Sequence, residues 1–232
     1  MTTLPNKEQA SGRLREVRLT TPIGHDQLEK LRIGDVAYID GVIYTAREGV
    51  YRRVLEDGMA PPVDFASLTN VNFHCSPAAA VQEDGSLKVS AVTATASFRF
   101  SKWMARWFDV SGAKVIVGKG GMSEADYKQL FVPRGAVYLT TVGYGTGALL
   151  GRGITRVRDA HWLDELGVAQ AMWVLEVEKF GPLLVESDLE GNSLFEENNL
   201  QINAGLDKLY EGLKRPSLAR YGETDDRGEE LI

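Results

Sequence analysis

The sequence is poor in cysteine and has no long apolar run. Cys75 is the single cysteine among 232 residues, so no internal disulfide can form. One thiol also cannot build a zinc or iron–sulfur site by itself, because such sites take several protein ligands. No apolar stretch approaches the roughly 20 residues of a bilayer-spanning helix, and residues 1–14 lack the apolar segment of a signal peptide. We therefore expect a cytoplasmic protein that binds no metal alone and does not enter a membrane.

Positive charge is in short supply as well. The chain carries 26 Lys and Arg against 32 Asp and Glu, for a formal net charge of −6. Without a surplus or a block of basic residues, a chain has little attraction for nucleic acid or for acidic membrane surfaces. The 44% hydrophobic and 25% charged residues are typical of a soluble globular protein. These numbers argue against a nucleic-acid-binding function.

The three histidines show no spacing typical of a metal site. His25, His74 and His161 are scattered along the chain, and we expect a structural role for each. Trp103 and Trp107 are four residues apart in a segment that favours a helix. That spacing places both on one helix face, which more often packs into a core than binds a ligand.

Strand-forming and helix-forming segments alternate along the chain, which indicates an α/β fold of layered, mixed sheets. The polar ends predict a flexible arm at 1–14 and a disordered acidic tail at 215–232, around one domain at 15–214. The expected strands are 16–19, 36–39, 42–45, 87–92, 114–117, 136–142, 171–177 and 183–186, and the expected helices are 25–31, 48–56, 101–108, 123–130 and part of 194–213.

Three local signals fix element ends. Asp40-Gly41 separates two β-rich runs, which predicts a hairpin with a type I′ turn. Ser101 is a plausible N-cap for the helix that follows it. Ser123, with Asp126 three residues later, has the spacing of a capping box.

Two segments place an arginine where a predicted strand meets a predicted helix. Arg47 follows the expected hairpin, and a guanidinium at such a junction can bind a carboxylate through two hydrogen bonds. The segment 93–99 holds the hydroxyls of Thr93, Thr95 and Ser97 together with Arg99. A strand-to-helix turn exposes backbone N–H groups as well, which suits an anion. Local capping or pairing is the alternative role for both segments.

Glycines surround a third cation. Lys119 ends a short predicted strand in the sequence Val-Gly-Lys-Gly-Gly, and the glycines would let a ligand approach the backbone. The segment is not a Walker A loop, because Gly120 stands where that motif needs Ser or Thr. A flexible turn without a ligand is the alternative.

A fourth segment, Gly143 to Ala148, fits the Gly-x-Gly-x-x-Gly/Ala fingerprint of dinucleotide-binding proteins, and Asp164 lies about twenty residues further on. However, the segment comes late in the chain, and Asp164 does not end a second predicted strand. A nicotinamide-binding oxidoreductase is therefore only a minor alternative.

Taken together, the order and spacing of these segments resemble the β subunit of L-tartrate dehydratase and the C-terminal domain of class I fumarases. The resemblance runs from about Val17 to Leu213. The segments that carry it are 19–23, 32–36, 45–47, 73–74, 117–122, 161–162, 178–183 and 191–194.

The resemblance implies a swivelling β/β/α layered domain and a hydro-lyase that reversibly adds or removes water on a dicarboxylic hydroxy-acid. It also implies a partner α subunit that carries a four-iron–four-sulfur cluster, in a hetero-oligomer such as a heterotetramer. By position, Arg47, Arg99 and Lys119 match substrate-binding cations of the family, and Thr95 matches the hydroxyl proposed as the general base. Cations around a dianion would neutralise it and stabilise the charge that develops when a proton leaves.

This sequence departs from the family pattern around those residues. Glu48 stands where the family usually has Asp, and Tyr51 where a His commonly follows. The family's Gly-Pro-Thr-Thr turn is Thr-Ala-Thr-Ala at 93–96, and an Ala-Gly-Pro segment is Cys-Ser-Pro at 75–77. These changes indicate a related substrate rather than fumarate or tartrate itself. They also leave open a degenerate, non-catalytic subunit that acts only as an interaction partner.

Overall fold

The computed structural model describes residues 14–143, 145–209, 211–212, 218–220 and 223–224. Contacts divide the chain into two compact units, residues 1–194 and residues 195–232. Nearly all of the predicted arm at 1–14 and most of the predicted tail at 215–232 lie outside the described residues. The unit at 1–194 holds all four candidate cation and hydroxyl positions.

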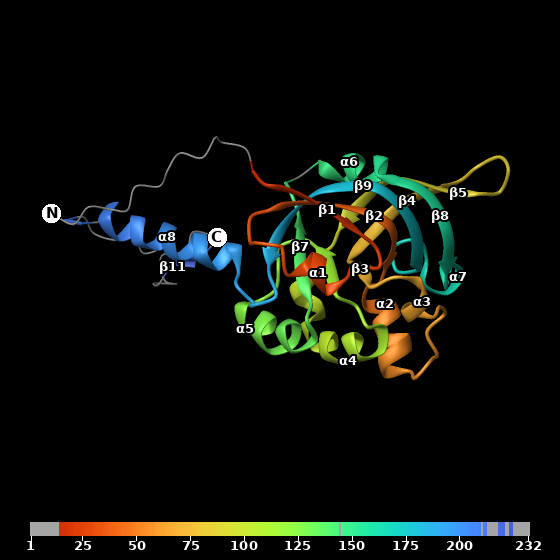
Figure 1. Cartoon of the computed structure of the whole chain (residues 1–232), viewed down its shortest axis with the longest axis horizontal. Coiled ribbons are helices and arrows are strands. Elements are labelled where there is room, and N and C mark those ends of the chain that lie inside the picture. The colour runs from red at the N-terminus through yellow and green to blue at the C-terminus, as the bar shows by residue number, and fades with distance from the viewer. Residues whose placement is uncertain (1–13, 144, 210, 213–217, 221–222, 225–232) are drawn as a thin grey trace. The chain divides into compact units, whose positions relative to one another are not determined.

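One mixed sheet of seven strands organises the first unit (Figure 1). Its order is β1-β2-β3-β6-β7-β9-β8, and β9 also pairs with β2, so that β2, β3, β6, β7 and β9 form a closed ring of pairings. The first five strands of that order run parallel, and β9 is antiparallel to β2, β7 and β8. The strands are β1 (Glu16–Thr20), β2 (Val36–Thr45), β3 (Val71–Phe73), β6 (Val115–Gly118), β7 (Val137–Thr141), β8 (Ile154–His161) and β9 (Met172–Ser187).

The predicted hairpin at Asp40-Gly41 is wrong. Residues 36–45 form the single strand β2, which pairs with β9 along its length. The Asp40 carboxylate accepts hydrogen bonds from the Arg18 side chain of β1 and from the backbone N–H of Lys179, at 2.8 Å in the latter case. Beside Gly41, β9 advances three residues while β2 advances two, which is a β-bulge. Asp-Gly therefore accommodates a bulge in a continuous strand, not a chain reversal.

A similar continuity joins the two late strands predicted at 171–177 and 183–186, which are one 16-residue strand, β9. Strands β1, β5 (Leu87–Ala94), β6 and β7 were predicted close to their observed positions. β3 and β8 were missed, as was β4 (Cys75–Val81), which pairs with β5 in a separate two-stranded sheet.

Helices α2 and α4 lie together at the bottom of Figure 1, and α6 (Thr146–Arg152) lies at the top. Helix α2 (Glu48–Tyr51) continues as a π-helical turn (Arg52–Glu56), and α4 (Ser101–Ser111) is preceded by a 3-10 turn (Ser97–Phe100). Ser101 is not the N-cap; its hydroxyl donates to Asp126 at 2.6 Å. The capping box of Ser123 and Asp126 is confirmed at the start of α5 (Glu124–Asp126). The other helices of this unit are α1 (His25–Leu28), α3 (Phe65–Leu68), the π-helical turn Tyr127–Phe131, the 3-10 turn Val132–Arg134, α6 (Thr146–Arg152) and α7 (Leu163–Leu166).

Two hydrophobic clusters lie on the two faces of the sheet, because successive strand residues point to opposite faces. In β6, Val115 and Val117 belong to one cluster and Ile116 to the other. The cluster that packs against α4 is rich in aromatic residues. It includes Trp103 and Trp107, as predicted. The central strands β3, β6 and β7 are thus buried on both sides, which leaves their ends as places for exposed functional groups.

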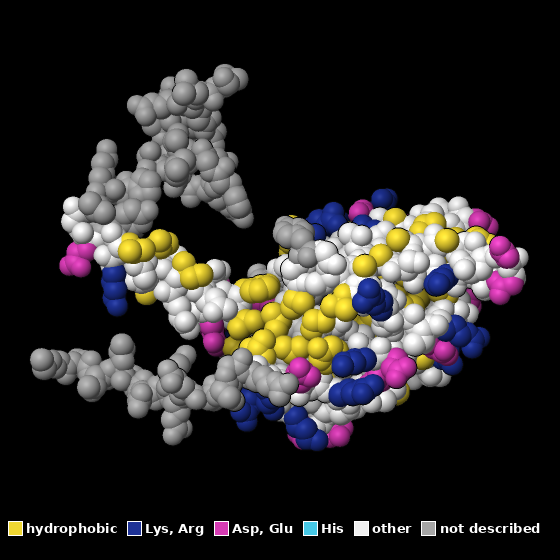
Figure 2. Space-filling view, turned by 90° about the horizontal axis from the view of Figure 1, so that it is seen from above, with side chains coloured by type: hydrophobic (Ala, Val, Ile, Leu, Met, Phe, Trp, Pro, Cys, Tyr) yellow, Lys and Arg dark blue, Asp and Glu magenta, His cyan; other side chains and the backbone are white. Residues whose placement is uncertain are grey.

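The second unit consists of α8 (Leu194–Leu209), which begins in the first unit, and the short strands β10 (Leu218–Arg220) and β11 (Glu223–Thr224). Exposed apolar side chains, among them Leu200, Ile202 and Leu206, lie along α8 (Figure 2). No helix among the described residues is long and apolar enough to cross a membrane.

Candidate functional site

The carboxyl ends of the parallel strands bring three of the singled-out segments to one edge of the sheet. Arg47 lies two residues beyond the end of β2, and Lys119 directly follows β6. His74 follows β3, which lies between them in the sheet. In α/β sheets, ligands bind outside the carboxyl ends of the strands. This edge is therefore the first place to look for a site.

The segment that follows β5 enters this edge from the side. The pairing of β3 with β6 ends at Phe73 and Val117. Beyond these residues the backbone of Thr95 lies between the two chain segments and is hydrogen-bonded to both. Thr95 N donates to His74 O at 2.7 Å, and Lys119 N donates to Thr95 O at 3.1 Å. Ser97 N donates to Lys119 O at 3.2 Å, so the turn that leads to Arg99 is hydrogen-bonded on both sides. Thr95, Arg99 and Lys119 are thus joined through the backbone.

Arg47 approaches this turn from β2. Its side chain is partly buried, and one terminal nitrogen, Nη1, donates to Ala169 O at 2.8 Å. Its Nε is buried without a hydrogen-bond partner among the described residues. The pKa of Arg47 is lowered, mainly by burial and next by the positive charge of Arg99. A guanidinium that has lost water and faces another cation is a binding group for an anion.

Arg99 and Lys119 are exposed, and neither forms an ion pair with a carboxylate in the part of the chain that the structure describes. Lys119 also lines a pocket of about 390 Å³ with the end of β5, Thr141 and residues 145–148. The structure therefore brings Arg47 within electrostatic range of Arg99, and it places Lys119 on the far side of the Thr95 turn.

Thr95 is the predicted general base, and its side chain is largely buried at 6% exposure. None of the described residues hydrogen-bonds its hydroxyl, which leaves that group for a ligand. Cys75 lies at the same edge but is buried, and burial raises the pKa of its thiol. A protonated, buried thiol is a poor nucleophile and a poor metal ligand.

Beneath the turn lies a fully buried chain of polar side chains that sequence reasoning missed. His74 Nε2 is 2.7 Å from the Tyr51 hydroxyl, and His74 Nδ1 is 2.7 Å from Ser97 Oγ. Asn72 Nδ2 donates to the Tyr51 hydroxyl at 2.7 Å, and the Tyr138 hydroxyl donates to Ser97 Oγ at 2.7 Å. We call these five residues the buried network. Burial, and secondarily the charge of Arg47, lowers the pKa of His74 to about 3, so the imidazole is neutral at physiological pH.

The other two histidines lie outside this arrangement. His25 begins α1, and His161 ends β8, where its Nε2 is 3.4 Å from the Asp159 carboxylate. Among the described residues, no group of three or more His, Cys, Asp or Glu side chains could hold a metal ion. Since the sequence has one cysteine, this chain does not offer the thiolate set of an iron–sulfur cluster.

Two glycines of α6 have a packing role, and one of them, Gly147, belongs to the dinucleotide-like segment. A Cβ added at Gly147 would lie 2.3 Å from Val92 O, and one at Gly151 would lie 2.2 Å from Ser90 O. Both glycines are in α6, which presses directly on the backbone of β5. Close contact between a helix and a strand accounts for Gly147 and Gly151, whereas Gly143 and Gly145, which match the fingerprint, have positive φ and open space around them. Tyr144 of the same segment lies outside the described residues.

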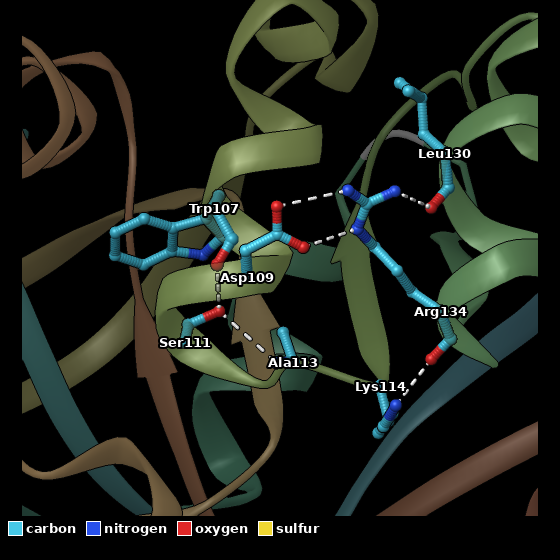
Figure 3. A network of polar contacts seen from close by, with 7 residues as sticks. All are labelled: Trp107, Asp109, Ser111, Ala113, Lys114, Leu130 and Arg134. Atoms are coloured by element: carbon cyan, nitrogen blue, oxygen red, sulfur yellow. Dashed lines mark hydrogen bonds and ion pairs between the residues drawn. The ribbon is translucent and has the colours of Figure 1, made fainter.

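Cations at the opposite, amino-terminal edge of the sheet are paired (Figure 3). Arg134, just before β7, donates to both oxygens of Asp109 at 3.0 and 3.2 Å, and to Leu130 O at 3.4 Å. The ammonium of Lys114, just before β6, donates to Arg134 O. These groups join the end of α4 to the starts of two strands, so their role is structural.

A layered α/β domain whose described cations at the carboxyl ends of the strands lack carboxylate partners has the charge that suits an anion. Comparison with known proteins gives a more specific class. The sequence model described as "Fumarase C-terminus" matches residues 1–198. The chain therefore belongs to the fumarase C-terminus family.

Comparison with individual proteins supports the same family. The chain is 32% identical over 183 residues to the L(+)-tartrate dehydratase subunit beta of Escherichia coli K12, covering 78% of this chain and 87% of the relative. It is 35% identical over 185 residues to a Methanocaldococcus jannaschii protein assigned as the same subunit, covering 78% and 92%. A Geobacillus stearothermophilus protein assigned as a class I fumarate hydratase is 32% identical, but there the match covers 79% of this chain and 34% of the longer relative. The relatives of similar length are thus β subunits of hydro-lyases.

Proposed function

We propose that this chain is the β subunit of an iron–sulfur hydro-lyase that adds or removes water on a dicarboxylic hydroxy-acid. The observation that carries the proposal is the group of cations without carboxylate partners around the Thr95 turn, with Arg47 partly buried and repelled by Arg99. Two separate cations suit a substrate with two carboxylates. The names of the relatives support the same class of reaction.

We assign binding of the substrate carboxylates to Arg47 and Arg99, with Lys119 as a further cation. In dehydration, a proton leaves the carbon next to a carboxylate, and the hydroxyl on the neighbouring carbon takes up a proton from a second group and leaves as water. The negative charge that develops on that carboxylate is stabilised by the fixed cations. We assign acceptance of that proton to Thr95 in its alkoxide form, because its hydroxyl has no hydrogen-bond partner among the described residues. The surrounding cations favour the negative form of that hydroxyl.

The cluster belongs, in this proposal, to a partner α subunit, since the residues of this chain do not fit it. The match covers 34% of the longer Geobacillus relative, which therefore has further sequence outside the matched part. A single domain at 15–214, as predicted from the sequence, would then dock on that partner in a hetero-oligomer such as a heterotetramer. The altered residues around Thr95 favour a hydroxy-acid related to malate or tartrate over those acids themselves.

The test is purification of the tagged chain from its source cells without oxygen. We expect a cysteine-rich second polypeptide, the broad visible absorbance of an iron–sulfur cluster, and turnover of malate, tartrate or a methylated analogue. A stable complex without cluster absorbance would contradict the proposal. A complex that contains the cluster but dehydrates none of these acids would favour the degenerate, non-catalytic subunit instead.

A further inference from the structure

We propose that His74 is a positioning residue, which acts through the buried network to hold the three cation-bearing segments at one fixed spacing. The inference rests on the proposed function, because it concerns the same cations. It goes beyond that function by assigning a role to residues that touch no substrate. The neutral side chains of the buried network would then determine the distances between Arg47, Arg99 and Lys119.

Each cation-bearing segment is tied to the network within a few residues of its cation. Tyr51 N donates to Arg47 O at 3.0 Å across the first turn of α2. On the second segment, Ser97 lies two residues before Arg99. On the third, Ser97 N donates to the carbonyl of Lys119 itself. His74 bonds both Tyr51 and Ser97 through its ring, and it therefore bridges all three segments.

The cations need such a support because they repel one another. Arg99 lowers the pKa of Arg47, which means that the two guanidiniums destabilise each other's charge. Among the described residues, no carboxylate forms an ion pair with these cations, and the attraction of Glu48 for Arg47 is weaker than the repulsion by Arg99. A surface held only by long side chains would relax to separate these charges. The network resists this because all of its members are buried and each hydrogen bond joins a different structural element.

The hydrogen bonds run in one direction through His74. The Tyr51 hydroxyl accepts from Asn72 Nδ2, and burial keeps the pKa of Tyr51 well above its usual value, so the hydroxyl keeps its proton. We assign that proton to the contact with His74 Nε2, which lies 2.7 Å away. In this assignment His74 carries its own proton on Nδ1 and donates it to Ser97 Oγ. The neutral Nδ1–H tautomer follows from taking Asn72 Nδ2 as the donor to Tyr51.

Gly118 shows how closely the network fits the Lys119 segment. A Cβ at this position would lie 2.0 Å from Ser97 Oγ and 2.5 Å from the Tyr138 hydroxyl. Distances this short are steric clashes, so a side chain at 118 would displace both hydroxyls. The glycine before Lys119 is thus explained by the buried network rather than by access of a ligand to the backbone.

The functional test compares three hydroxyl deletions in the purified complex with its partner. Tyr51→Phe and Ser97→Ala each remove one link. Tyr44→Phe is the matched control, because Tyr44 is equally buried in the same aromatic cluster but its hydroxyl has no partner in the described structure. A misplacement of about 1 Å can cost on the order of a hundredfold in rate, so we expect kcat/KM to fall roughly 10- to 100-fold in the two network variants, with KM raised and kcat lowered. The control should stay near wild type.

A second measurement on the same variants does not depend on catalysis. Nitrogen-15 NMR of the histidine rings should show His74 neutral and protonated on Nδ1 in the wild type, and should show that pattern lost in Tyr51→Phe. An Nε2–H tautomer in the wild type would overturn the proposal. So would a network variant with the changed NMR pattern but wild-type kcat and KM, or one whose loss is matched by Tyr44→Phe.

Failure of this inference is distinguishable from failure of the proposed function. If Arg99→Ala abolishes turnover while Tyr51→Phe does not alter it, the cation site stands and the positioning role falls. If Arg99→Ala leaves turnover unchanged, the proposed function itself is wrong.

Discussion

Strand β6 has a lysine at each end, and the two are in opposite situations. Lys114, at the amino end, donates to the carbonyl of Arg134, which is itself paired with Asp109. Lys119, at the carboxyl end, is exposed and has no carboxylate partner among the described residues. The same contrast holds for the neighbouring strands. Arg15 pairs with Asp35 just before β2, whereas Arg47, just after β2, has a buried Nε without a partner.

The presence or absence of a partner separates cations that stabilise the fold from cations that are available to bind a ligand. A paired cation gains from its partner without a ligand. A group of like charges without counter-charges raises the free energy of the folded protein, and such groups persist where function requires them. Residue type alone does not make the distinction. The position at one end of a parallel strand or the other does, together with the presence of a carboxylate.

The largest expected effect is on Arg99. Arg99→Ala in the assembled complex should lower kcat/KM by about a hundredfold or more, the typical cost of removing one group that stabilises charge in a transition state. Since Arg99 repels Arg47, the thermal unfolding temperature should not fall. Arg134→Ala, at the amino edge, is the matched control and should leave kcat/KM unchanged. Equal losses in the two variants would remove the functional distinction between the two edges.

A smaller effect is expected for Lys119, which is exposed and lies on the far side of the turn. Lys119→Ala should lower kcat/KM by roughly tenfold, about 1.4 kcal/mol of transition-state stabilisation. Lys114→Ala should not change kcat/KM, and it should slightly lower the unfolding temperature by removing the bond to Arg134 O. Steady-state kinetics and thermal unfolding of both variants check this. A kinetic loss confined to Lys114→Ala would contradict the assignment.

The sequence predicted most elements of the first unit because their hydrophobic patterns and caps are local. It failed where the deciding partner is distant. Asp40-Gly41 fits a hairpin turn, but Arg18 and the backbone of Lys179 bind Asp40 and make the segment part of one long strand. β3 was missed because three residues give no periodic pattern.

The same reason limits how much of the site could be predicted. Arg47, Arg99 and Lys119 stand beside Gly or small residues where strands end, so a pattern could mark them, and the family resemblance added their roles. The buried network joins residues far apart in the sequence, and its central member follows the missed strand β3. A lone histidine in an apolar segment gave no sign that its ring would bridge Tyr51 and Ser97.

The smallest expected effect is on the ion pair between Arg15 and Asp35 at the amino edge, and it is tested by changing Asp35. Burial raises the pKa of Asp35, but hydrogen bonds from the Arg15 side chain and from Arg32 N outweigh it, and the pKa is lowered overall. A carboxylate with a lowered pKa stabilises the fold above its unfolded pKa of about 3.9, and that contribution disappears as the pH falls through the folded value. Asp35→Asn should therefore lower the free energy of unfolding by about 1 kcal/mol at neutral pH, since Arg15 is partly exposed. The difference from wild type should shrink below pH about 4, and kcat/KM should not change. Denaturant unfolding across this pH range is the measurement, and a difference that persists undiminished in acid would show that the ion pair is not its cause.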